Sequence, residues 1–256
     1  MKSQYRMLFA LVVLLLAVSL ACNALTAPAS TAVPVNEEPP VVAEPTEEPQ
    51  VEDPAPVATE PPVQASAPDF FTEEFDGDIS NWSQVVELNA QEGNKSQANM
   101  AVEDGRLVFD FGKWLIGYAF YDPYTYTNVR VDMKVENRGT NVNNILLICR
   151  ASDEGHYLVN VANSGLFGMY AFNGETGSYT RIADGGSNKI KSGKEINEYA
   201  LVCNEKNITL FINGFEARSY TDNQFVFREG QVGVGVASEN QLPVKVEIDW
   251  VKISEP

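Results

Sequence analysis

The chain has 256 residues, and its 35 acidic residues outnumber its 18 basic ones, which gives a formal net charge of −17. Proteins that bind nucleic acid neutralise phosphates with clustered Lys and Arg, so this balance argues against a nucleic-acid partner. A single histidine and three cysteines also leave little material for a histidine-based triad or a Cys/His metal cluster.

The N-terminal segment, residues 1–21, has the layout of a secretory signal peptide. Lys2 and Arg6 give it a positive start, and residues 7–21 form a charge-free apolar run that only Ser19 interrupts. A membrane-spanning helix takes about 20 apolar residues, so this run is short for a transmembrane segment. An uncleaved membrane anchor is the alternative interpretation.

Residues 19–22 read Ser-Leu-Ala-Cys and resemble a bacterial lipobox, although the leucine stands two positions before the cysteine and not three. The resemblance implies cleavage before Cys22, a diacylglyceryl group on that cysteine, and a lipid-anchored protein at the extracytoplasmic face of the cell membrane. Two or three acyl chains exceed the single chain that binds a membrane only marginally. Ordinary cleavage after Ala21, followed by secretion, is the alternative.

Residues 22–68 combine the predicted lipidated cysteine with a linker that we expect to be disordered. After Cys22 the segment contains 11 of the 14 prolines and eight acidic residues, and it lacks Lys, Arg and aromatic residues. Such a composition cannot bury enough apolar surface to offset the entropy of ordering. The repeated Glu-Pro units favour extended conformations, which predicts a tether between membrane and domain.

Residues 69–256 are long enough for one domain with a substantial core. Apolar and polar residues alternate in NVRVDMKVEN (128–137), which predicts a half-buried β-strand. No stretch of the domain shows convincing helical spacing. Other strand-like runs occupy residues 106–111, 144–150, 156–162, 166–172, 198–204, 208–214, 230–238 and 243–253.

The turns between these runs favour antiparallel pairing. Asn213-Gly214 predicts a type I′ hairpin, because both central residues of that turn need φ > 0. Gly230, Gly233 and Gly235 predict bulges or a close approach of neighbouring backbone. About ten strands with short polar turns predict an all-β antiparallel sandwich, which we expect to be monomeric.

Two cysteines remain once Cys22 is assigned to the lipid. Cys149 and Cys203 lie in the strand-like runs NILLICRAS and EYALVCNEK of a domain that we expect to be exported, where disulfides persist. We predict that they pair across the sheet, and closing a loop of about 54 residues contributes roughly 4 kcal/mol in the chain-entropy model. Two buried free thiols are the alternative.

Three segments carry a resemblance to a known superfamily: FTEEFDGDISNWSQ (71–84), ITLFINGFEARSYTDNQFVFREGQVGVGV (208–236) and VEIDWVKI (246–253). They resemble the concanavalin A-like lectin/glucanase superfamily, which includes laminin G-like domains, legume lectins, laminarinase-type glycosidases and 3-keto-disaccharide hydrolase-like domains. The resemblance implies a jelly-roll sandwich over essentially the whole domain, with its two ends adjacent. Trp82 and Trp250 would be core or strand-edge packing residues.

The motif Glu247-Ile248-Asp249 raises the question of glycosidase chemistry, since retaining enzymes use two carboxyl groups about 5–5.5 Å apart. Hydrolases of the superfamily carry Glu-x-Asp-x-x-Glu or Glu-x-Asp-x-Glu, and the domain contains neither. We interpret the motif as part of the closing strand, with Val246, Ile248 and Trp250 on one face. The sequence favours a non-catalytic lectin-like module that binds carbohydrate or a surface partner. A hydrolase of the 3-keto-disaccharide hydrolase-like type and a structural or adhesion domain are the alternatives.

The resemblance also implies a structural calcium ion. Laminarinase-like relatives often hold one between the two ends of the domain, with ligands near the first strand and an Asp in the closing strand. On this sequence those ligands are Glu74, a carbonyl near Gly105, and Asp249, and such oxygen ligands suit calcium. Two surface carboxylates without a metal are the alternative.

A carbohydrate site is expected on the concave face or at its rim, where aromatic rings pack on sugar CH groups and polar side chains bind hydroxyls. The aromatic stretch 114–128 supplies two candidates, and strands that the resemblance places near the middle of the sheet supply four. The candidates are Trp114, Tyr118, Arg150, Tyr157, Asn160 and Tyr170. Purely structural roles for these side chains are the alternative.

Overall fold

The computed structural model describes residues 67–256. The predicted signal peptide, the predicted lipidation site Cys22 and nearly all of the predicted linker lie outside the described residues. The described part is all-β, with one 3₁₀ turn at Lys95–Gln97 and two antiparallel sheets. No helix in this part is long and apolar enough to cross a membrane.

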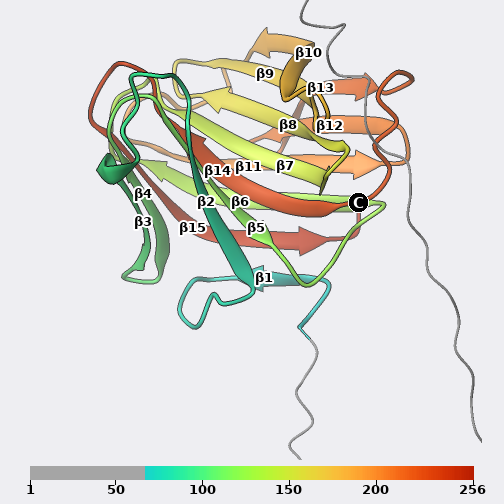
Figure 1. Ribbon diagram of the computed structural model, residues 1–256, viewed down its shortest axis with the longest axis horizontal. Helices are drawn as coiled ribbons and strands as arrows, with labels where there is room; N and C mark the ends of the chain where they lie inside the picture. The colour runs from blue at the N-terminus through green and yellow to red at the C-terminus, as the bar shows by residue number, and fades with distance from the viewer. Residues whose placement is uncertain (1–66) are drawn as a thin grey trace, which may run out of the picture. The chain divides into compact units, whose positions relative to one another are not determined.

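The first sheet has eight strands. They are β1 (Phe71–Glu73), β3 (Ala98–Glu103), β4 (Arg106–Phe111), β6 (Val129–Asn137), β11 (Ile196–Asn204), β12 (Asn207–Ile212), β13 (Phe215–Thr221) and β15 (Val244–Ser254). Their spatial order is β13-β12-β11-β6-β15-β4-β3, and β1 pairs with part of β15 (Figure 1).

The second sheet has seven strands. They are β2 (Trp82–Leu88), β5 (Leu115–Tyr121), β7 (Asn144–Ser152), β8 (Gly155–Ala162), β9 (Leu166–Asn173), β10 (Ser178–Gly186) and β14 (Gln231–Ala237). Their spatial order is β10-β9-β8-β7-β14-β5-β2 (Figure 1). The predicted all-β antiparallel jelly-roll sandwich is therefore confirmed.

The two sheets pack face to face around one continuous apolar core. In β6, buried and half-buried positions alternate, and Val129, Val131 and Met133 are fully excluded from solvent. Full burial of a side chain of this kind contributes about 1.5–3 kcal/mol relative to exposure. The alternation in the sequence thus supplies the driving force for packing the sheets.

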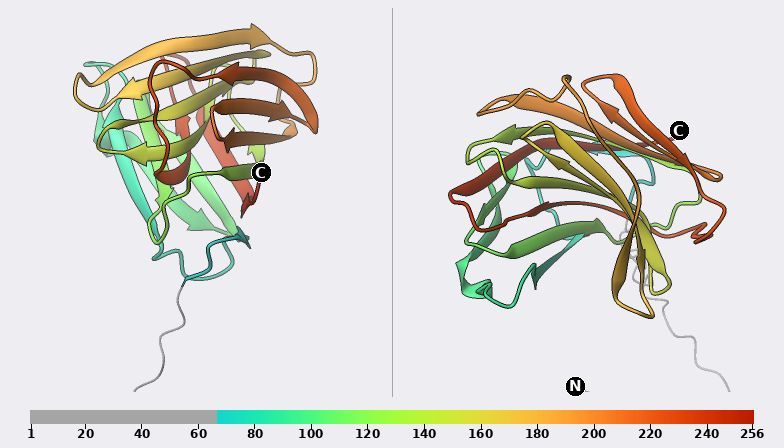
Figure 2. Two further views of the ribbon diagram at one scale, coloured as in Figure 1. Left: turned by 90° about the vertical axis from the view of Figure 1, so that its right-hand side faces the viewer. Right: turned by 90° about the horizontal axis from the view of Figure 1, so that it is seen from above.

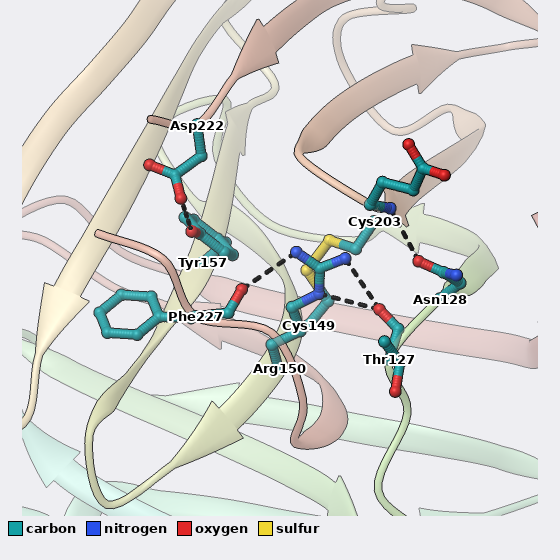
Figure 3. Close-up of a disulfide and its surroundings, with 9 residues drawn as sticks. Thr127, Asn128, Cys149, Arg150, Tyr157, Cys203, Asp222 and Phe227 are labelled. Carbon is teal, nitrogen blue, oxygen red and sulfur yellow. Dashed lines mark hydrogen bonds between the residues drawn. A yellow bond between two sulfur atoms is a disulfide. The ribbon is translucent and has the colours of Figure 1, made fainter. Parts of the chain in front are cut away.

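The disulfide between Cys149 and Cys203 fastens the two sheets together and confirms the predicted pairing. Cys149 lies in β7 of the seven-stranded sheet and Cys203 in β11 of the eight-stranded sheet. Their Cα atoms are 6.6 Å apart, and 54 positions separate them in sequence. The bond therefore crosses the sandwich and does not join strands of one sheet (Figure 3).

Both ends of the domain meet on one strand, as the resemblance implied. β1 pairs antiparallel with β15, with Phe71 opposite Ile253. Three tyrosine hydroxyls from the aromatic stretch then donate to backbone carbonyls just before β1: Tyr124 to Ala67 at 2.7 Å, Tyr126 to Asp69 at 2.6 Å, and Tyr121 to Pro68. Much of that stretch therefore fixes the point at which the chain enters the domain.

The turn predicted at Asn213-Gly214 joins β12 and β13 and has φ values of 50° and 81°. Both angles are positive, as a type I′ turn requires, so that prediction is confirmed. Gly235 confirms the predicted close approach of backbone, because a Cβ atom there would lie 2.4 Å from the carbonyl oxygen of Gly117.

The closing strand departs from simple alternation. The pairing of β15 with β6 shifts register between Ile248 and Trp250, which marks a β-bulge. Beyond the bulge, Val251 and Ile253 are buried and Trp250 is only partly buried. The prediction that Trp250 shares a face with Val246 and Ile248 is therefore wrong, because the extra residue reverses the alternation.

Candidate functional site

The seven-stranded sheet is strongly curved, so the face that points away from the core is concave. Four strands separate β5 from β10, which would put these two strands about 24 Å apart in a flat sheet with ~4.8 Å between strands. Nevertheless, the hydroxyl oxygens of Tyr118 in β5 and Tyr179 in β10 lie 3.3 Å apart. Two tyrosine side chains cannot span the flat distance, and Figure 2 shows the bent sheet from two further directions.

One part of the concave face is filled by the protein's own apolar side chains. β7 buries both of its faces, because Leu146 and Ile148 alternate with the core residues Leu147 and Cys149. Those two side chains form a second apolar cluster with Tyr118, Leu158 and Ala237.

An aromatic stack extends this filled part toward the β10 edge. The ring of Phe172 lies 4.8 Å from that of His156 and 4.7 Å from that of Tyr179. Burial lowers the pKa of His156 to about 4, which keeps the imidazole neutral at physiological pH. This part of the face therefore has an apolar and uncharged character.

Beside and above this apolar cluster, the concave face forms an open groove with two compartments of about 380 and 250 Å³. Four residues line both compartments, which makes the groove continuous: Asn144, Asn160, Tyr170 and Glu239. The larger compartment extends toward the β10 edge and adds Arg181 and Asp184 among its lining residues. The smaller one has an apolar floor that includes Ile116, Leu146, Leu158 and Ala237. We call this feature the concave groove.

The polar side chains of the concave groove are largely free to bind a ligand. Asn144 donates to a carboxylate oxygen of Glu239 over 3.3 Å, which leaves the second oxygen of that carboxylate without a partner among residues 67–256. Within the same described part of the chain, the side chains of Asn160, Arg181 and Asp184 form no hydrogen bond or ion pair. The groove therefore offers amide, carboxylate and guanidinium groups to a polar molecule.

Tyr170 supplies an aromatic surface beside these polar groups. Its ring meets that of Tyr179 edge-on, with centroids 6.4 Å apart, and the guanidinium of Arg181 lies 5.9 Å from its centroid. Aromatic rings with a few well-placed polar groups are the usual lining of a small-molecule site. The combination suits a ligand with apolar CH faces and many hydroxyl groups.

The structure brings three of the six predicted binding residues together on the concave face. Asn160 and Tyr170 line the concave groove, and Tyr118 belongs to the adjoining apolar cluster. Trp114 is half-buried in the turn before β5, where its backbone N–H donates to the carbonyl of Glu239 over 3.2 Å. It does not line either compartment of the groove.

Arg150 is fully buried, which corrects its prediction as a binding residue. Its guanidinium donates to the carbonyl of Thr127 over 3.0 and 2.8 Å and to that of Phe227 over 3.1 Å (Figure 3). The register of β7 and β8 shifts between Cys149 and Ser152, and Arg150 has φ 57°, so the alternation is broken at this point. Burial lowers the pKa of this guanidinium, and the side chain serves packing.

Tyr157 is also fully buried, so its predicted contact with a ligand is wrong as well. Its hydroxyl donates to the carboxylate of Asp222 over 2.7 Å, and its ring lies 5.2 Å from that of Phe227 (Figure 3). Strict alternation along β8 places Tyr157 toward the core and Asn160 on the concave face. The two residues stand three positions apart, so alternation places them on opposite faces of the strand and both could not line the same face.

The carboxylates of the Glu-Ile-Asp motif belong to an ion-pair network on the eight-stranded sheet. Glu247 lies 2.8 Å from Arg106 and 3.3 Å from Arg138. Burial acts to raise the pKa of Glu247, but Arg106 and Arg138 together outweigh it and hold that pKa below its usual value. Asp249 lies 2.7 Å from Lys134 and 3.5 Å from Arg106.

This network also involves Asp249, one of the two carboxylates predicted to bind calcium. The oxygens of Asp249 already face two cationic side chains, Lys134 and Arg106. Residues 67–256 contain no group of three or more His, Cys, Asp or Glu side chains that could hold a metal ion. The predicted site has two carboxylates and a backbone carbonyl, so calcium binding by Glu74 and Asp249 stays a prediction.

Sequence reasoning missed several residues of the concave groove. Arg181 and Asp184 lie in β10, an edge strand with little alternation, and a bulge between Arg181 and Ala183 interrupts its pairing. Glu239 follows β14 in a loop, and Asn144 begins β7. No local pattern marks these residues, because the pairing of β7, β8, β9 and β10 in the sheet brings them together from separate segments of the chain.

The sequence matches no protein-family model and no curated protein. Among solved structures, the carbohydrate-binding module CBM66 from Bacillus subtilis is similar, with 13% identity, a TM-score of 0.50, and coverage of 68% of this chain and 96% of that chain. A β-1,3-glucanase from Mycobacterium marinum has 12% identity and a TM-score of 0.53, covering 74% and 100%. The Bacillus licheniformis β-glucanase has 11% identity and a TM-score of 0.55, covering 74% and 99%. At these identities the likeness is one of architecture, and the chain has the concanavalin A-like jelly-roll fold.

Proposed function

We propose that residues 69–256 form a non-catalytic carbohydrate-binding module, with the concave groove as its binding site. The observation that carries this proposal is the groove itself, where the Tyr170 ring lies beside the free side chains of Asn160, Arg181 and Asp184. A sugar ring presents CH groups to an aromatic face and hydroxyls to amides and charged groups. The names of the similar structures, a carbohydrate-binding module and two glucanases, support the same class of ligand.

The non-catalytic part of the proposal rests on the carboxylates. The domain lacks the Glu-x-Asp-x-x-Glu and Glu-x-Asp-x-Glu patterns of superfamily hydrolases. The Glu-Ile-Asp motif lies in β15 of the eight-stranded sheet, where cations pair with both of its carboxylates. The motif therefore lies in the eight-stranded sheet, whereas the concave groove lies on the seven-stranded sheet.

A sugar-active hydrolase is the second candidate, and one observation favours it. Asp184 and Glu239 place two carboxylates in the concave groove, and glycoside hydrolysis uses a carboxylate pair. The two functions differ in outcome, since a hydrolase releases product and a binding module returns its ligand intact.

For the whole chain, we propose a lipid anchor at Cys22 and display at the extracytoplasmic face of the cell membrane. The signal-like segment, the lipobox-like residues and the acidic Pro-rich linker support this arrangement. A structural or adhesion role without a small ligand is the third candidate. Mass spectrometry of the full chain from a bacterial membrane fraction tests the anchor, because a Cys22→Ala variant would lose the diacylglyceryl mass and the membrane association.

A glycan array probed with the soluble domain tests the central proposal. We expect binding to at least one glycan, and loss of that signal in Asn160→Ala and Tyr170→Ala. Incubation with the bound glycan, followed by chromatography of the products, separates binding from hydrolysis. Hydrolysis would overturn the non-catalytic assignment, and silence in both assays would favour the structural or adhesion role.

A further inference from the structure

The concave groove carries more negative than positive charge. Two carboxylates, those of Asp184 and Glu239, line it, and Arg181 is the one cationic side chain among the lining residues that the structure describes. Glu87 adds a third carboxylate nearby, where its charge helps to raise the pKa values of Tyr118 and Tyr179 beyond the effect of burial. The surroundings do not reverse this balance, since residues 69–256 contain 27 acidic and 16 basic residues.

The carboxylates are placed to accept hydrogen bonds from hydroxyl groups. Neither Asp184 nor Glu239 has a cationic partner within residues 67–256, and only Glu239 has a hydrogen-bond donor there, from Asn144 over 3.3 Å. An ionised carboxylate is a strong acceptor and has no proton to donate. It therefore binds a hydroxyl or an amine well, whereas it repels a second anion in the same groove.

Arg181 does not offset this repulsion along the whole groove. It lies over the Tyr170 ring, with its guanidinium carbon 5.9 Å from the ring centroid, at the β10 edge. Glu239 lines both compartments, whereas Arg181 lines only the larger one. A ligand that spans the groove therefore meets a carboxylate in each compartment and a guanidinium in one.

We propose that the concave groove selects uncharged glycans and rejects anionic ones, such as those with uronic acid or sulfate groups. Glu239 and Asp184 are the residues that determine this selectivity. This inference rests on the proposed function, because it assigns a ligand class to the same groove.

The test compares an uncharged oligosaccharide with its uronic-acid counterpart, in which a carboxylate replaces a primary hydroxyl. Isothermal titration of the soluble domain should give at least about tenfold tighter binding to the uncharged form. Glu239→Gln and Asp184→Asn remove one charge each and keep the side-chain shape, so each should reduce that ratio. Raising the salt to about 0.5 M should reduce it too, because the charges are exposed and screened.

Glu216→Gln is the matched control, since it removes the same charge from an exposed position on β13 of the other sheet. It should leave the ratio unchanged, which separates a local effect from that of net charge. Equal or tighter binding of the uronic-acid form, especially if Arg181→Gln abolishes it, would overturn the inference and leave the proposed function standing. Failure of both glycan classes to bind would instead overturn the proposed function, and this inference with it.

Discussion

The hydroxyl of Tyr118 in β5 lies 3.3 Å from that of Tyr179 in β10, although four other strands of the seven-stranded sheet lie between β5 and β10. This contact joins the two flanks of the concave face beside the apolar cluster of Leu146, Ile148 and Leu158. It marks the boundary between the filled part of that face and the open groove, whose smaller compartment Tyr179 helps to line.

Tyr179→Phe removes the hydroxyl and keeps the ring. We expect it to lower the free energy of unfolding by about 1 kcal/mol or less, the contribution of one hydrogen bond. Tyr179→Ala also removes the contacts with His156 and Phe172 and should cost more, about 2 kcal/mol, because the side chain is partly exposed. Urea denaturation of both variants measures this, and equal losses would contradict a packing role for the ring.

Removing the disulfide should weaken the sandwich substantially. A Cys149→Ala/Cys203→Ala variant loses the cross-link between the sheets, whose two cysteines are 54 positions apart in sequence. In the chain-entropy model, a cross-link that closes a loop of this length stabilises the folded state by roughly 4 kcal/mol. The midpoint of denaturant unfolding should fall accordingly, and wild-type protein should approach the same midpoint in reductant. Free thiols in the unfolded wild-type domain without reductant would contradict the pairing.

Arg150→Met should destabilise the domain and leave the groove intact. The methionine fills similar space, but the carbonyls of Thr127 and Phe227 lose their guanidinium donors in the core. Buried polar groups without partners cost about 1–3 kcal/mol each, so a loss of roughly 3 kcal/mol is expected. Thermal unfolding measures the loss, and glycan binding well below the melting temperature should match that of wild type. Lost binding with full stability would place Arg150 in the site.

His156 should make the domain less stable in mild acid. Its pKa is lowered by burial to about 4 in the folded state, from an ordinary value of 6.5. Between pH 4 and pH 6.5 the imidazole binds a proton in the unfolded chain but not in the folded one. The contribution of His156 to stability is therefore constant above pH 6.5 and falls as the pH drops below that value. His156→Phe keeps a ring against Phe172 and removes the titration.

The expected loss for wild type between pH 7 and pH 5 is about 1–2 kcal/mol. Urea denaturation at the two pH values checks it, and the variant should lose less. Identical losses in the two proteins would show that another group titrates in this range.

Alternation predicted strands well wherever one face of a strand is buried and the other is not. β6 and β12 show this, because the core itself imposes the period of two. The disulfide was also predictable, since only two cysteines are left in the domain. β10 escaped prediction because it is an edge strand with exposed residues at its start and a bulge in its pairing.

Bulges limited the prediction of the site for the same reason. One near Arg150 and one near Trp250 reverse the alternation, and neither leaves a local mark in the sequence. The concave groove depends further on the order of strands in the seven-stranded sheet, which places Asn160 near Arg181 and Glu239. Such a relationship is a property of the assembled sheet and not of any single segment.

The most direct test of the account is calorimetric titration of the array-positive glycan into Tyr170→Ala, with Phe215→Ala as the control. Phe215 is an exposed aromatic residue on β13 of the opposite sheet and lines neither compartment of the groove, so its loss removes a similar surface outside the site. We expect at least tenfold weaker binding for Tyr170→Ala, which corresponds to about 1.4 kcal/mol, and wild-type affinity for Phe215→Ala. Wild-type affinity in Tyr170→Ala would contradict the assignment of the concave groove as the carbohydrate-binding site.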